Sequence, residues 1–259
     1  MREASTFIFD GESSEDMGVM IASPEVGLYE EAFFPTRTIV ETKIPGKDNP
    51  YYQRVEMEPL SFPLTIFIHE WRERDNARQI ARWLCQSYYK PLIFDTNLNR
   101  IYYAIFDGDS RLIHNGAKDG YITLNVRCSS PFSYSYPKSS KDEIRDMGEM
   151  TIYNTGDVDI KPKMWIKKVG GDGSIQIENL TTSQVIRMDN LQNNEEVFVD
   201  FDKEEIVSSL EYLTVYRYDD HNNEWLILES NLDGENRLKF TGDFDVQFEY
   251  EMKYLSEWR

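Results

Sequence analysis

Apolar and polar residues alternate along most of this chain, and a period of two predicts β-strands. Residues 62–68 are the clearest case, because an apolar side chain stands at every second position and defines one face. Pro63 lies within them and has no backbone N–H to donate, so this strand is expected to start there or to lie at a sheet edge. Two apolar runs, 92–94 and 101–106, flank an Asp- and Asn-rich tip at 95–99 and predict a β-hairpin.

One segment departs from this alternation and predicts a helix. Between Arg72 and Tyr88, apolar or small residues recur at the three- and four-residue spacing of one helical face. These residues are Ala77, Ile80, Ala81, Leu84 and Tyr88. Asp75 is the expected N-cap, and Pro91 prevents any continuation of the helix. The pattern predicts one helix in the chain.

A change of composition divides the chain into two parts. Residues 129–140 are rich in Ser, Tyr and Pro and lead into a charged run, which is typical of a domain boundary. Short strands then follow at close intervals, including 226–228 and a long final strand over 244–254, and this spacing is typical of a β-sandwich. We therefore predict a mainly β protein of two domains, residues 1–137 with the helix and hairpin, and residues 138–259.

The charge of the chain excludes several classes of partner. It carries 28 Lys and Arg against 46 Asp and Glu, a net charge of −18. Binding to nucleic acid or to an anionic membrane surface requires a basic face, so we predict neither kind of partner. Residues 1–137 hold 14 basic and 19 acidic residues (net −5), whereas residues 138–259 hold 14 and 27 (net −13). A partner of the second domain is therefore expected to be basic or neutral.

Candidate catalytic and metal-binding residues do not form a recognisable pattern. His69 begins a sequence similar to the zinc-protease motif, but Glu73 stands where the second His is needed. Cys85 and Cys128 lack the spacing of metal ligands and are expected to be buried free thiols in a reducing compartment. Acid-rich turns such as 219–224 do not match a calcium loop. We predict no enzymatic activity, no catalytic residue, no metal and no cofactor.

The aromatic residues leave an alternative function open. Trp165, Trp225 and Trp258 could stack on sugar rings from the surface of a β-sandwich, although Trp in alternating strands more commonly packs in the core. A carbohydrate-binding module that contacts cell-wall sugars is therefore the second hypothesis. A glycoside hydrolase is the third hypothesis, because its catalytic pair of carboxylates could be drawn from the 46 acidic residues. It ranks last because no pair among them is distinctive.

Several segments of the first half resemble siphophage distal tail (Dit) proteins. Residues 7–11 and 16–19 are similar to the opening of that family, and so is the loop 44–51. The family loop commonly reads Pro-Gly-Arg-Asp-Gly, whereas Lys47 replaces the Arg here. The predicted helix and hairpin, and the strand end at 128–132, then follow in the order of the family.

The second half resembles the galectin-like domain of the same proteins. The similar features are residues 154–156, Pro162, Asn179 and residues 195–200. The resemblance implies an N-terminal β-sandwich-like domain with one helix and a hairpin, followed by a galectin-like β-sandwich, and it offers no catalytic residues to transfer.

The resemblance also implies a structural role in the virion. Proteins of this family form a homohexameric ring through their N-terminal domains, between the tail tube protein and the tail-associated lysin or tip protein. Their C-terminal domains anchor receptor-binding proteins or the baseplate. We therefore expect a protein of the distal tail, assembled in the cytoplasm of the host bacterium. The residues predicted to contact neighbouring subunits or partners are Phe33, Phe34, Pro45, Lys47, Tyr51 and Tyr52.

Overall fold

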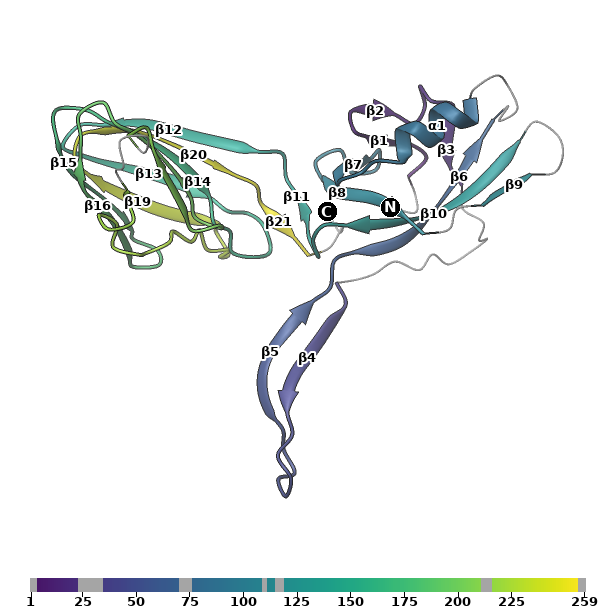
Figure 1. Ribbon diagram of the computed structural model, residues 1–259, viewed down its shortest axis with the longest axis horizontal. Coiled ribbons are helices and arrows are strands. Elements are labelled where there is room, and N and C mark those ends of the chain that lie inside the picture. Colours follow the sequence, from purple (N-terminus) through teal and green to yellow (C-terminus); the bar gives the residue numbers. More distant parts are fainter. Residues whose placement is uncertain are drawn as a thin grey trace. The chain divides into compact units, whose positions relative to one another are not determined.

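The structure is a computed structural model that describes residues 4–22, 35–69, 76–108, 111–114, 119–210 and 216–255. Strands dominate it, and the described residues contain one helix, α1 (Asn76–Leu84) (Figure 1). The strands are β1 (Phe7–Phe9), β2 (Glu12–Ser13), β3 (Val19–Ile21), β4 (Arg37–Thr42), β5 (Tyr51–Met57), β6 (Ser61–Ile68), β7 (Lys90–Phe94), β8 (Tyr102–Asp107), β9 (Leu112–His114), β10 (Gly120–Cys128), β11 (Ser133–Tyr134), β12 (Lys138–Ile144), β13 (Met147–Tyr153), β14 (Lys163–Lys168), β15 (Gly173–Asn179), β16 (Gln184–Leu191), β17 (Glu196–Asp200), β18 (Glu205–Ser208), β19 (Glu235–Thr241), β20 (Phe244–Tyr250) and β21 (Lys253–Tyr254). The mainly β fold class is confirmed.

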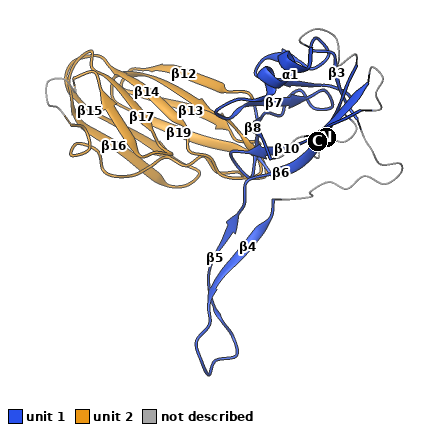
Figure 2. Ribbon diagram, turned by 45° about the vertical axis from the view of Figure 1, so that its right-hand side comes forward, with its two compact units in different colours: residues 1–135, 254–259 blue, residues 136–253 orange. Residues whose placement is uncertain are grey.

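The chain forms two compact units (Figure 2). Unit 1 comprises Met1–Ser135 together with Tyr254–Arg259, and unit 2 comprises Tyr136–Lys253. No helix in the described part of the chain is long and apolar enough to cross a membrane.

Unit 1 is built on an eight-stranded sheet with one helix in its core. The strand order is β2-β1-β7-β8-β10-β6-β3, with β9 added beside β10. The buried face of α1 contributes Ile80, Trp83 and Leu84 to the same apolar core as the strands. The Trp83 ring stacks on Phe7 at 5.4 Å, and its indole N–H donates to the Phe9 carbonyl at 2.9 Å. This hydrogen bond satisfies the polar atom that burial of a Trp would otherwise leave unpaired.

The position of Pro63 in this sheet follows from its missing N–H. Strand β6 pairs with β10 along its length, but β3 pairs only with residues 66–68 of β6. Among the described residues, Pro63 therefore lies where one side of β6 has no neighbouring strand, which is where a sheet tolerates proline.

Helix α1 ends earlier than the sequence pattern predicts. It stops at Leu84, and Tyr88, the last residue of the predicted apolar face, is 65% exposed. The side-chain amide of Gln86 donates to the Trp83 carbonyl at 2.8 Å, which satisfies one of the free carbonyls in the last helical turn. The predicted face also omitted Trp83. The proposed N-cap, Asp75, lies outside the described residues.

The hairpin predicted around residue 95 is confirmed, since β7 and β8 are antiparallel neighbours. Its tip also holds the N-terminal segment. The carboxylate of Asp95 accepts hydrogen bonds from the backbone N–H groups of Ser5 and Thr6, at 3.1 and 3.0 Å, and from both hydroxyls. Burial alone would raise the pKa of Asp95, but these hydrogen bonds outweigh it and hold the pKa below its usual value.

Replacing Asp95 by Ala is expected to release this segment from the tip. The loss of these hydrogen bonds should cost about 1–2 kcal/mol locally. Hydrogen exchange at the Ser5 and Thr6 amides should therefore accelerate, while Asn99→Ala in the same tip should leave it unchanged. Equal exchange in both variants would show that the Asp95 bonds do not hold the segment.

Unit 2 is a β-sandwich. One sheet has the order β12-β20-β14-β17-β18 and the other the order β13-β19-β15-β16. Buried apolar residues alternate with exposed ones along most of these strands. The ring of Phe240 on β19 contacts those of Phe244 and Phe248 on β20, at 6.0 and 6.3 Å, so the two inner faces meet in one core.

Residues 226–228 do not form the predicted strand. Leu226 and Leu228 are buried, but the segment makes only one isolated bridge, to Ile160. Buried amide side chains take the place of a neighbouring strand: Asn179 donates to the Ile227 carbonyl and Asn154 to the Leu228 carbonyl, both at 2.9 Å. The backbone groups are thus satisfied without a ladder.

The long final strand predicted over 244–254 is divided in two. Strand β20 ends at Tyr250, and β21 pairs with β11 instead. At the start of β21 the backbone passes so close to Gly156 that a Cβ atom on Gly156 would stand 2.6 Å from the Lys253 carbonyl oxygen. Tyr254 then joins unit 1, where the guanidinium of Arg100 lies 3.1 Å from the centre of its ring.

Candidate functional site

Strands β4 and β5 form an antiparallel ribbon that we call the arm, residues 37–57. Among the described strands they pair only with each other, and Figure 1 shows them as a two-stranded extension of unit 1. Every residue of β5 is exposed, and in β4 only Val40 is half-buried. A strand normally buries one face, whereas this ribbon leaves both faces accessible. An isolated two-stranded ribbon is at best marginally stable in water, so the arm has the properties of an element completed by a partner.

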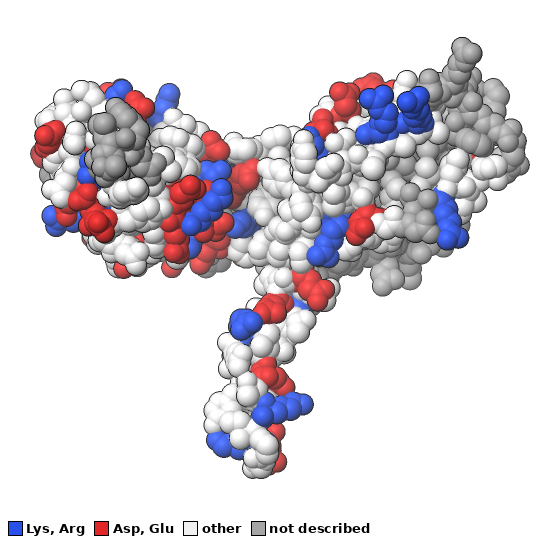
Figure 3. All heavy atoms as spheres, viewed as in Figure 1, with Lys and Arg blue, Asp and Glu red and all other residues white. Residues whose placement is uncertain are grey.

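The arm exposes large apolar side chains on both strands. Ile39 is 62% exposed and Tyr52 is 66% exposed, and Ile39 stands opposite Val55 in the register. The full set is Ile39, Ile44, Tyr51, Tyr52, Val55 and Met57. Lys and Arg lie among Asp and Glu along the same ribbon (Figure 3). Apolar groups interspersed with both signs of charge are typical of a protein contact surface.

Four of the six predicted contact residues lie on the arm. Pro45 and Lys47 lie in the turn at its tip, and Tyr51 and Tyr52 begin β5. The ammonium of Lys47 donates to the Tyr51 hydroxyl and lies 4.8 Å from the centre of the Tyr51 ring, so these two side chains stabilise the tip. Phe33 and Phe34 lie outside the described residues. A contact role for all six residues stays a prediction, and the sequence pattern did not reveal Ile39 or Val55.

A second exposed apolar surface crosses the outer face of the unit 1 sheet. Met20, Phe67, Tyr121 and Ile113 are cross-strand neighbours on β3, β6, β10 and β9, and we call them the sheet-face row. Met20, Tyr121 and Ile113 are 50%, 46% and 68% exposed, and the rings of Phe67 and Tyr121 lie 5.2 Å apart. Unit 1 therefore presents two different apolar surfaces, the arm and this row.

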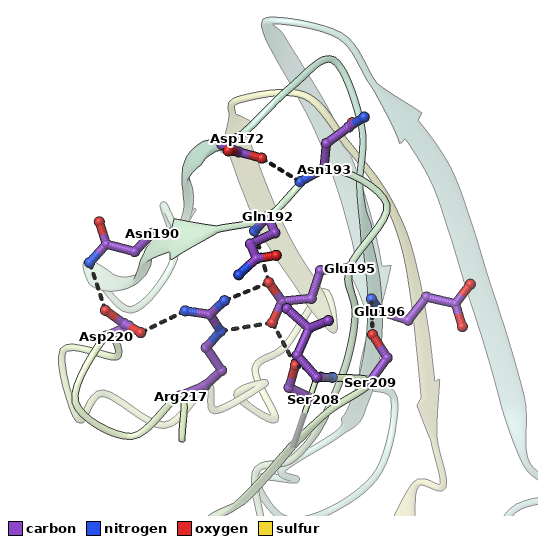
Figure 4. Close-up of polar contacts among 11 residues, drawn as sticks. Asp172, Asn190, Gln192, Asn193, Glu195, Glu196, Ser208, Ser209, Arg217 and Asp220 are labelled. Atoms are coloured by element: carbon purple, nitrogen blue, oxygen red, sulfur yellow. Dashed lines mark hydrogen bonds and ion pairs between the residues drawn. The ribbon is translucent and has the colours of Figure 1, made fainter. Parts of the chain in front are cut away.

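Unit 2 contains a buried ion pair between Arg217 and Glu195 (Figure 4). The guanidinium donates to both carboxylate oxygens, at 2.7 and 2.6 Å, and the side chains are 4% and 0% exposed. Arg217 also donates to Asp220 at 2.7 Å, and the Asn190 amide donates to the same carboxylate at 2.7 Å. The cluster joins the turn before β17 to the segment after residue 216. Its burial indicates a structural role rather than a binding site.

Further hydrogen bonds keep the Glu195 carboxylate ionised. The Ser208 hydroxyl and the Gln192 N–H donate to it at 2.6 and 2.8 Å. Burial would raise the pKa of Glu195, but the hydrogen bonds from Arg217, Ser208 and Gln192 hold that pKa below its usual value. Hydrogen bonding to Glu195 in turn raises the pKa of Arg217.

The Trp residues predicted as sugar-stacking candidates differ in exposure. Trp225 is half-buried and packs against His221 at 4.9 Å and Phe201 at 6.3 Å between ring centres. These two contacts give Trp225 a packing role on part of its ring, and sugar stacking by this residue stays a hypothesis. Trp165 is 38% exposed on β14, and Trp258 lies outside the described residues.

Side chains with metal-binding or redox chemistry are dispersed. Among the described residues, no three His, Cys, Asp or Glu side chains are grouped so as to hold a metal ion. His69 lies 3.0 Å from the Asp119 carboxylate at the surface. Cys128 is buried as predicted, but Cys85 is exposed because it follows the end of α1. The two cysteines form no disulfide.

Family models match both halves of the chain. Residues 2–130 match a phage tail protein N-terminal domain, and residues 132–250 match a phage tail C-terminal domain. The chain therefore belongs to this family of phage tail proteins.

Individual relatives support the same assignment. The SPbeta prophage-derived uncharacterized protein YomH of Bacillus subtilis (strain 168) is 35% identical over 260 residues, covering 98% of this chain and 100% of YomH. The crystal structure of the Dit protein of phage SPP1 matches with a TM-score of 0.69 at 15% identity, covering 95% of this chain and 98% of that one. The resemblance to distal tail proteins is thus confirmed, with the fold of a Dit hub protein extending over both units.

Proposed function

We propose that this protein is a non-enzymatic structural hub of the phage tail, in which six copies form a ring through unit 1. The ring joins the tail tube protein to the tail-associated lysin or tip protein, and unit 2 anchors proteins of host adsorption. Membership of the phage tail family and the Dit fold support a place in the tail. The SPP1 Dit protein is described as a paradigm of the hub of the adsorption apparatus in phages that infect Gram-positive bacteria.

The observation that carries the ring is the pair of apolar surfaces on unit 1. A ring needs a heterologous interface, in which one patch of each subunit contacts a different patch of the next. The arm and the sheet-face row are two such patches on one chain, and both are exposed in the single subunit. In the ring, the exposed arm gains a packing partner that the described residues of its own chain do not provide.

Light scattering of the purified full-length protein on a sizing column tests this proposal. We expect a mass near six chains, or one that reaches six chains when purified tail tube protein is added as a template. A protein that stays monomeric under both conditions would contradict the hexameric ring. A stable dimer would also contradict it, since a two-fold interface pairs one patch with itself.

A further inference from the structure

Trp165 lies on the outer face of the larger sheet of unit 2 and is not needed for the core. Strand β14 buries every second residue and turns Trp165 outward, leaving 38% of the residue exposed. No described residue accepts a hydrogen bond from its indole N–H. The buried Trp83 of unit 1 differs in this respect, because its indole N–H is bound to the Phe9 carbonyl.

The neighbours of Trp165 across the sheet form a short row with it. Phe198 on β17 stands directly opposite, with ring centres 5.0 Å apart, and Val207 on β18 stands beyond Phe198. On the other side, Gln247 on β20 is exposed, and its amide has no hydrogen-bond partner among the described residues. We call these four residues the Trp165 row. It combines an apolar surface with a free amide at one end.

Charged residues border the Trp165 row on both sides. On one side of the row, Lys163 of β14 stands opposite Glu249 of β20 in the strand register. On the other side, Lys167 of β14 stands between Asp245 of β20 and Glu196 of β17. Lys167 contacts Glu196 at 3.1 Å, with both side chains about half exposed or more, at 47% and 64%. The register also places Lys141 and Glu143 of β12 beside Gln247 and Asp245, and Asp200 beside Lys163 with Glu205 beyond it. Six carboxylates and three lysines therefore surround the row, so this face is acidic, as are residues 138–259 with their net charge of −13.

We propose that the Trp165 row is a saccharide-binding site for a neutral sugar ring. The apolar C–H face of a pyranose packs on the Trp165 ring, while the Gln247 amide and the Lys163 ammonium hydrogen-bond its hydroxyls. An apolar surface with a few polar groups placed around it is the general composition of a small-ligand site. The excess of carboxylates around the row repels an anionic polymer, whereas a neutral sugar meets no such repulsion.

The size of the row also favours a sugar over a protein partner. A stable protein interface buries about 800 Å² on each partner, roughly 20–30 residues a side. The apolar part of this row is three side chains wide and is bordered at once by charges. One or two sugar rings match that extent. The site is independent of the proposed ring, because it uses only residues of unit 2.

Titration calorimetry of the full-length protein with two neutral oligosaccharides, chitotetraose and maltotetraose, tests this site. We expect at least one of them to bind. Replacing Trp165 by Ala should weaken that binding about tenfold, equivalent to about 1.4 kcal/mol. Trp165→Tyr, which keeps an aromatic face, should stay within about threefold of the parent protein. Met147→Ala, at a 64% exposed position on the other sheet, should leave affinity unchanged.

Three results would overturn the proposal. The first is that neither oligosaccharide binds at millimolar concentration. The second is that Trp165→Ala binds as tightly as the parent protein. The third is that Trp165→Ala and Trp165→Tyr change only the oligomeric mass, which would make the row a protein contact. Thermal unfolding of each variant verifies that unit 2 remains folded.

Discussion

Replacing Arg217 by Ala is expected to destabilise unit 2 by about 3–5 kcal/mol, because it leaves the Glu195 carboxylate buried without its counter-charge. Glu195 is fully buried, and it would lose two hydrogen bonds of 2.7 and 2.6 Å at once. Urea-dependent hydrogen exchange of the β14 and β17 amides in the full-length chain measures this loss. It reports on unit 2 separately from unit 1.

An exposed ion pair of the same unit provides the matched control. Arg187 contacts Asp189 at 2.8 Å, with side chains 55% and 38% exposed. Because such pairs are screened by water, Arg187→Ala should cost no more than about 1 kcal/mol. Equal losses in Arg187→Ala and Arg217→Ala would show that the buried cluster does not depend on its charge.

Unit 2 should lose stability in acid, because folding lowers the pKa of Glu195. The folded-state pKa lies below the usual value of 4.5, so the unfolded chain takes up a proton first as the pH falls. The stabilisation from Glu195 is therefore complete above pH 4.5 and is lost as the pH falls below it. Glu195→Gln should remove this part of the acid dependence, and an unchanged acid transition would contradict the assignment.

Period-two alternation predicts a strand only where one face is buried, and the arm shows this limit. Residues 61–68 alternate clearly, because β6 covers the core of unit 1 with one face. The arm has no buried face, so its strands carry no such alternation and were not predicted as a hairpin. The sequence predicts Tyr51 and Tyr52 as contact residues because they are apolar residues in a segment with a weak strand pattern, but only the structure places them on a paired strand.

Hydrogen bonds made by side chains account for the other differences between sequence and structure. Residues 226–228 have the composition of a strand, yet Asn154 and Asn179, which are distant in sequence, bind their carbonyls instead. The Glu195–Arg217 pair spans 22 residues in a chain with 46 acidic side chains, so nothing local marks it. The final turn of α1 depends on the Gln86 side chain rather than on periodicity.

Removing the arm is expected to abolish the ring while leaving the subunit folded. In the full-length chain, residues 39–55 would be replaced by a short Gly-Ser turn. This replacement keeps the base of the arm, where the Glu58 N–H donates to the Thr36 carbonyl. Because both faces of the ribbon are exposed in the subunit, unfolding free energy should change by no more than about 0.5 kcal/mol. The mass measured by light scattering should fall from six chains to one.

Point variants separate the apolar contacts of the arm from its backbone. Ile39→Asp combined with Tyr52→Asp places two charges where large apolar groups are 62% and 66% exposed. If these side chains are interface hot spots, each should cost about 2–4 kcal/mol at every contact, enough to dissociate a ring. Arg54→Ala, an exposed charge on the same ribbon, should leave the mass unchanged. A ring that survives both the double variant and removal of the arm would place the contact elsewhere, with the sheet-face row as the next surface to change.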